Sequence, residues 1–68
     1  MNYVRVVVRD TKGEMVELRD APIYDEGMSE TRKVHFGRTV MAKIVDQAYR
    51  KFEGNVGYSI SAEFVEHN

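Results

Sequence analysis

The sequence contains no cysteine and only two histidines, His35 and His67, which lie far apart. The absence of cysteine excludes disulfides and thiolate metal sites, and the histidine positions match no spacing of metal ligands. We therefore expect no cofactor and no bound metal. A chain without cysteine also fits a cytoplasmic location, which is the location we expect.

Long apolar runs and a charge excess are also lacking. No apolar segment approaches the roughly 20 residues that span a bilayer, and the N-terminus lacks the apolar stretch of a signal peptide. Ten basic and eleven acidic residues give a formal net charge of −1. We therefore expect no membrane association, and no global field attracts nucleic acid to the chain.

The 68 residues are enough for one short domain, spanning 1–68. A chain of this length buries only about 60% of its unfolded surface, so a lone monomer has little net stability. Without disulfides or a metal, self-association is the simplest additional source of stability. We expect a homo-oligomer, most simply a symmetric dimer.

The stretch from Gly37 to Gly54 predicts an amphipathic helix that organises the domain. Gly37 is an acceptable N-cap and Gly54 suits the left-handed position that ends a helix. Apolar side chains recur at helical spacing and form a stripe wide enough to cover a sheet. The stripe consists of Val40, Met41, Ile44, Val45, Ala48 and Phe52.

Three segments alternate as β-strands do, at 2–9, 14–19 and 58–65. The buried faces that we predict carry Val4, Val6 and Val8 in the first strand, Val16 and Leu18 in the second, and Tyr58, Ile60, Ala62 and Phe64 in the last. Glu17 and Arg19 are then expected to point outward. On the far side of the sheet, Tyr3, Val7 and Val65 form a modest apolar patch suited to self-association.

Residues 31–36 fit either a short third strand or an early helix start capped by Ser29. The second alternative places Gly37 inside a helix at a cost of about 1 kcal/mol, so we favour the strand. The order is then strand, strand, an optional third strand, helix and strand. We predict an α+β two-layer domain with a three- or four-stranded, mainly antiparallel sheet and one amphipathic helix packed on one face.

Residues 20–31 break every periodicity, and so long a loop in a small domain is usually functional or disordered. Large apolar residues stand here among acidic ones. They either fold back under the core, as Ile23 and Met28 can, or anchor a partner, as Tyr24 and Met28 can. The candidate partner-binding residues are Ile23, Tyr24, Asp25, Glu26 and Met28.

A second candidate site is basic, because positive charge is concentrated in residues 31–52. Such residues form an ordinary solvated helix face, a docking face for a protein, or a site that contacts phosphates. Exposed aromatic residues for base stacking are scarce. The candidate residues for nucleic acid or another anion are Arg32, Lys33, Arg38, Lys43, Arg50 and Lys51.

Catalysis is not indicated, because no serine stands in a nucleophile elbow and no paired acids converge on an obvious pocket. We therefore predict a small non-enzymatic interaction protein that binds a partner protein; an inhibitor or regulator of the viral or mobile-element type fits this description. The first alternative is a nucleic-acid-binding protein that uses the basic back of the helix. The second is a small-ligand site at a subunit interface, with Tyr24, Arg38 or Arg50 contacting an anion.

Overall fold

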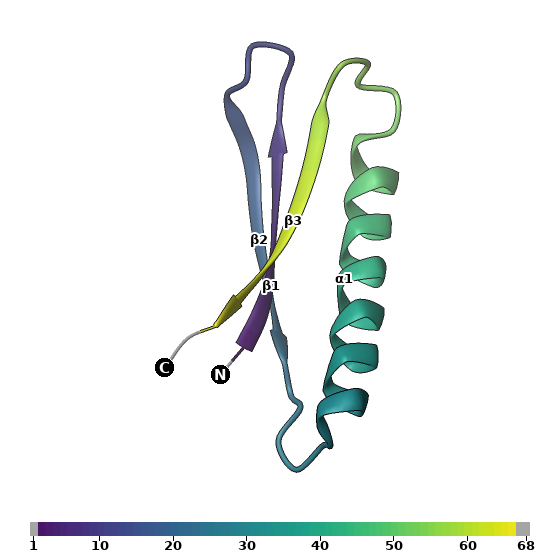
Figure 1. Cartoon of the computed structure of the whole chain (residues 1–68). Coiled ribbons are helices and arrows are strands. Elements are labelled where there is room, and N and C mark those ends of the chain that lie inside the picture. The colour runs from purple at the N-terminus through teal and green to yellow at the C-terminus, as the bar shows by residue number, and fades with distance from the viewer. Residues whose placement is uncertain (1, 67–68) are drawn as a thin grey trace.

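A computed structural model describes residues 2–66, so His67 lies outside the described residues. The elements are β1 (Asn2–Arg9), β2 (Met15–Ile23), α1 (Glu30–Phe52) and β3 (Ser59–Glu66), as Figure 1 shows. The strands form one antiparallel sheet in the order β2-β1-β3. The predicted class, a small α+β domain with one helix on one sheet face, is confirmed.

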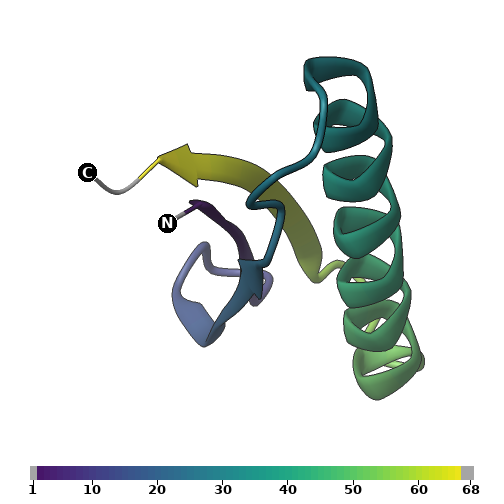
Figure 2. The same ribbon diagram turned by 90° about the horizontal axis from the view of Figure 1, so that it is seen from below.

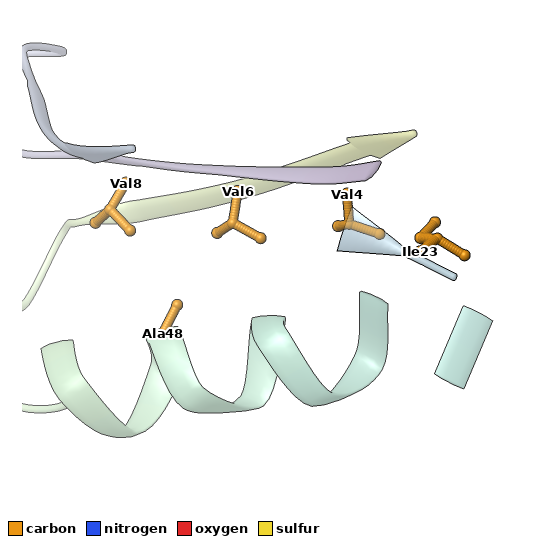
Figure 3. Close-up of a cluster of buried hydrophobic side chains, with 5 residues drawn as sticks. All are labelled: Val4, Val6, Val8, Ile23 and Ala48. Carbon is orange, nitrogen blue, oxygen red and sulfur yellow. The ribbon is translucent and has the colours of Figure 1, made fainter. Parts of the chain in front are cut away.

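The core lies between β1 and α1. Val4, Val6 and Val8 are at most 1% exposed and point toward the helix, where Ala48 faces them (Figure 3). The predicted helix stripe packs around this centre, together with residues of β3 and the loop before it, which confirms that part of the sequence prediction. The partly buried members are Phe36, Val40, Met41, Ile44, Val45, Phe52, Tyr58, Ile60 and Ala62.

The helix begins eight residues earlier than the sequence predicted, because its N-cap is Ser29 instead of Gly37, so the predicted strand at 31–36 is wrong. Ser29 is the N-cap, and its hydroxyl accepts a hydrogen bond of 3.3 Å from the Arg32 amide. Gly37 therefore lies inside α1 instead of capping it. A Cβ at Gly37 would lie only 3.2 Å from the Phe64 ring, so the missing side chain gives β3 room to approach the helix.

The face of the second strand that is turned toward the helix is the opposite of the predicted one. β2 extends to Ile23, which pairs with Asn2 and is only 5% exposed. Because side chains alternate along a strand, Glu17 and Arg19 share the helix side with Ile23, while Leu18 points away. Arg19 donates to the Gln47 amide oxygen at 3.3 Å, and Glu17 pairs with Lys51. The polar side of β2 is thus held by polar groups on the flank of α1.

The connection before the helix is also shorter than predicted, because strand and helix take up both ends of the segment 20–31. Residues 24–29 remain, and Gly27 there has a φ of 79° that suits a turn. Pro22 is tolerated because β2 is an edge strand, where a missing amide hydrogen need not break the sheet. No helix in the described part of the chain has both the length and the apolar character needed to cross a membrane.

Candidate protein-binding site

The face of the sheet that points away from α1 carries no second layer within the described residues (Figure 2). The strand register arranges its side chains in four rows across the sheet. These rows, which we call the open face, are Pro22–Tyr3–Val65, Asp20–Arg5–Glu63, Leu18–Val7–Ser61 and Met15–Arg9–Ser59. Met15 is 54% exposed and Leu18 45%. Apolar groups thus lie on both sides of a charged row.

Arg5 and Asp20 form the centre of the open face. The Arg5 Nε donates to one carboxylate oxygen of Asp20 at 2.9 Å, and Nη2 donates to the other at 3.1 Å. The same Nη2 reaches the Tyr3 hydroxyl at 3.3 Å, and the guanidinium lies 5.3 Å from the centre of the Tyr3 ring. This two-pronged geometry fixes three neighbouring side chains in one arrangement.

The ion pair also shifts the titration of both partners. Hydrogen bonding from Arg5 lowers the pKa of the Asp20 carboxyl, because it stabilises the charged form. The hydrogen bond to Asp20 raises the pKa of Arg5 in turn, and the charge of Glu63 adds a smaller contribution. Glu63 itself is in no ion pair of the described residues and remains an exposed acid beside the pair.

The residues predicted for partner binding in the 20–31 segment are brought together only in part, because of the five only Ile23 and Asp25 line the same groove. Ile23 is part of the core, whereas Tyr24, the next residue, is 68% exposed. Asp25 and Met28 are half-buried and Glu26 is exposed. Asp25 lines a groove beside Phe64, whereas Met28 lines a separate hollow. Some residues of this segment therefore pack against the core and others are free to contact a partner. Partner binding by this segment stays a prediction.

The six predicted basic residues are distributed around α1. Three of them lie in ion pairs: Arg50 with Asp46 at 2.8 Å, Lys33 with Glu30 at 3.6 Å, and Lys51 with Glu17. The other three form no ion pair within residues 2–66 and are Arg32, Arg38 and Lys43. At 100° per residue, Arg32 and Lys43 share the outer side of the helix, but Arg38 lies on another side. A continuous basic stripe is therefore not formed by all six.

A groove of about 320 Å³ runs between the N-terminal half of α1 and the end of β3. Phe64 and Val34, each 53% exposed, line it together with Gly37. Its charged lining residues have both signs and are Lys33, Arg38, Asp25, Glu30 and Glu66. The sequence predicted a buried Phe64, but its side chain is exposed, and the end of β3 diverges from the helix here (Figure 1).

The described residues hold no cluster of three histidine or acidic side chains that would bind a metal. His35 is exposed on the helix, and its backbone oxygen accepts a hydrogen bond from Thr39 at 3.0 Å. The arrangements found in residues 2–66 are ion pairs and apolar surfaces, which support noncovalent binding.

Sequence reasoning found part of the open face and missed another part. Tyr3, Val7 and Val65 were predicted there, whereas Leu18 and Met15 were not. The missing signal lay in the apolar residues of segment 15–23, which occupy both strand phases, so the alternation of Val16 and Leu18 alone was ambiguous.

The fold is a two-layer α+β domain in which the described residues leave one sheet face uncovered. Comparison with protein-family models, with curated proteins and with solved structures found no match for the chain.

Proposed function

We propose that this chain is a non-enzymatic interaction protein that binds a partner protein through the open face. The observation that carries the proposal is the uncovered sheet face, with apolar rows on both sides of the Arg5–Asp20 pair. Tyrosine, arginine and methionine are enriched at protein interfaces, and the open face presents Tyr3, Arg5 and Met15.

The chemistry of the open face indicates what the partner presents. The rows containing Tyr3 and Val7 require apolar groups opposite them, because burial of apolar surface supplies most of the binding free energy. Arg5 is already neutralised by two hydrogen bonds from its side chain to Asp20. Glu63 is not neutralised, so a basic side chain of the partner placed opposite it avoids burying an unpaired charge.

Nucleic-acid binding by the helix remains the alternative, but the observations favour it less. Half of its candidate residues are already paired with acids, as Arg50 is with Asp46. Among the strongly exposed aromatic side chains only Tyr49 lies on α1, whereas Tyr24 and Phe64 lie on other segments of the described chain. Binding of single-stranded nucleic acid uses several stacking rings along one surface.

Site-specific photo-crosslinking tests the proposal. A photoreactive phenylalanine analogue replaces Tyr3 or Leu18 on the open face and, as a control, Thr39 on the helix. We expect the same protein to be captured in cells of the native host from the two open-face positions and not from Thr39. That protein, once purified, should bind the chain at least about tenfold more weakly after Leu18→Lys, because the new charge is buried against an apolar surface.

Thr39→Lys is the matched control, because it adds the same charge at an exposed helix position. It should leave the affinity for the captured protein unchanged. Equal capture from Thr39, or equal affinity of the two lysine variants, would contradict the proposal. Binding of nucleic acid in a gel-shift assay, weakened by salt and by Lys43→Glu together with Arg32→Glu, would support the alternative.

A further inference from the structure

The two edges of the sheet differ in how well they are protected against pairing with another chain. β2 carries Pro22 and a register irregularity opposite Val8 and Arg9, both of which discourage addition of a strand. β3 has neither proline, glycine nor a basic residue, and all eight of its residues pair in unbroken register with β1. Outside this ladder, no hydrogen bond among residues 2–66 involves the backbone of 59–66. The outer edge of β3 is therefore an open row of donors and acceptors.

We propose that β3 pairs with β3 of a second copy of this chain, antiparallel and in one register, with Ala62 opposite its own symmetry mate. A two-fold axis perpendicular to the sheet produces this pairing and places both helices on the same side. Two sheets of three strands then become one of six. The proposal uses the backbone edge of β3, whereas the open face is the flat side of the sheet; Ser61 and Glu63 belong to both, but Leu18 and Tyr3 lie away from this edge, so either proposal can fail without the other.

Side-chain complementarity selects the register. With Ala62 on the axis, Ser61 of each copy lies opposite Glu63 of the other, where its hydroxyl can donate to the carboxylate. Ile60 then lies opposite Phe64 on the helix side. A shift that places Glu63 on the axis would oppose two like charges, which is unfavourable. A shift that places Ser61 there would pair only residues 59–63 of each strand.

The flanks of β3 complement each other under the same axis. The groove at one end is lined by Phe64 and Val34, and a hollow at the other end is lined by Tyr49, which is 59% exposed, and Ile60. The axis brings the first end of one copy to the second end of the other. The dimer contains two such junctions, so these apolar residues lose solvent contact in both copies.

Both junctions also carry charges. The groove is lined by Lys33 and Arg38 together with Asp25, Glu30 and Glu66, and the hollow is lined by Glu53. Arg38 and Glu53 belong to no ion pair in the described part of the chain, so Arg38 is the groove cation that is free to pair with Glu53 of the second copy.

The single chain exposes more surface than is usual for its mass. Its accessible surface is 5111 Å². A monomeric protein of 7.9 kDa is expected to expose about 4,400 Å². The excess of about 700 Å² is distributed over the whole molecule, and association of two copies would cover part of it.

Sedimentation equilibrium on the purified full chain tests the proposal. We expect a dimer, with twice the chain mass of 7.9 kDa, at high micromolar concentration. Ser61→Glu should weaken it, because two glutamates then face each other at two symmetric positions, whereas Ser61→Lys should strengthen it. The dissociation constant should change about two- to thirtyfold in each direction.

Ser59→Glu and Ser59→Lys are the matched controls, because Ser59 is exposed on the same strand but lies opposite Val65 in this register. They should change the dissociation constant less than the Ser61 pair, and in no charge-dependent direction. A monomer at all accessible concentrations would overturn the proposal. So would a dimer that responds equally at both serines, or one that Leu18→Lys abolishes while Ser61→Glu leaves it intact.

Cysteine crosslinking provides a second measurement, because the natural sequence has no cysteine to interfere. Directly opposed residues of antiparallel strands have Cα atoms about 4.5–5.5 Å apart, within disulfide range. A mixture of Ser61→Cys and Glu63→Cys chains should form the mixed disulfide faster than either chain crosslinks with itself. Faster self-crosslinking of Ser61→Cys would overturn the register.

Discussion

The pairing of Arg5 with Asp20 gives one aspartate a pH response that a solvated carboxyl would not show. Arg5 hydrogen bonds lower the pKa of Asp20 in the folded chain, so folding favours its charged form. Its contribution to stability is fully present above the unfolded pKa. It is lost as the pH falls through the lower folded value.

We predict that the Asp20 carboxyl, followed by NMR through an acid titration, has a midpoint below the usual aspartate value of about 3.9. In Arg5→Gln the midpoint should rise, because the charged hydrogen-bond donor is gone. Arg9→Gln is the control, since Arg9 donates to the Gly13 carbonyl at 3.0 Å and not to Asp20. A midpoint for Asp20 that is the same in wild type and Arg5→Gln would contradict this explanation.

Gly37 shows why the start of the helix could not be decided from local sequence. Ser29 offered a cap, but a glycine eight residues later counted against a helix by about 1 kcal/mol. What favours glycine here is its close contact with the Phe64 ring, and Phe64 lies near the other end of the sequence. Tertiary packing at a single residue thus outweighed helix propensity.

At the scale of elements, the helix stripe and the central strand were predictable because the pattern of each allows only one face to be buried. Val4, Val6 and Val8 alternate with mostly polar neighbours, and the stripe around Ala48 has a helical period only. In β2 either face could be the buried one, since apolar residues occur at both odd and even positions of the strand. Its phase is set by Ile23 packing under the helix and by polar contacts to Gln47 and Lys51. None of these contacts is local in sequence.

The same reasons explain how much of the candidate site was predictable. Tyr3, Val7 and Val65 lie in strands with unambiguous phase, so their place on the open face followed from the sequence. Leu18 depended on the phase of β2 and was assigned to the wrong face. The segment 20–31 was predicted to be one long loop because proline is rare within strands. β2 nevertheless continues through Pro22 to Ile23, since it is an edge strand.

The contact between α1 and β1 leads to a prediction for this pair of elements. Ala48 is 1% exposed and faces the valines of β1 (Figure 3). We predict that Ala48→Leu lowers the free energy of unfolding by about 1–3 kcal/mol, because the larger side chain forces helix and sheet apart. Urea unfolding followed by circular dichroism measures this change.

Ala42→Leu makes the same chemical change at an exposed position of the same helix. It should alter the free energy of unfolding by no more than about 0.5 kcal/mol. Equal losses for the two variants would show that packing between α1 and β1 does not limit stability.

At the scale of the whole molecule, the chain is a thin slab with Cα extents of 41 × 22 × 13 Å. One layer of strands and one helix leave few side chains covered on all sides, and only five apolar residues among residues 2–66 are buried. Association of two such slabs adds to the stability of both, because the folded state is then favoured by mass action.

We therefore predict that the midpoint of thermal unfolding rises with protein concentration. The rise follows from a dimer that binds folded chains and not unfolded ones. Ser61→Glu should reduce this dependence and Ser59→Glu should not. Differential scanning calorimetry over a dilution series measures it, and a midpoint independent of concentration would contradict a dimer.

The central place of β1 has a consequence for synthesis on the ribosome. Among the described elements β1 is made first, but one of its two neighbours, β3, is made last. Until β3 is available, β1 has one bare edge, because α1 and the connection after it are made before β3. A nascent chain at this stage exposes a strand edge with Val4, Val6 and Val8 alongside, which is the kind of surface that chaperones bind and that neighbouring polypeptides can capture.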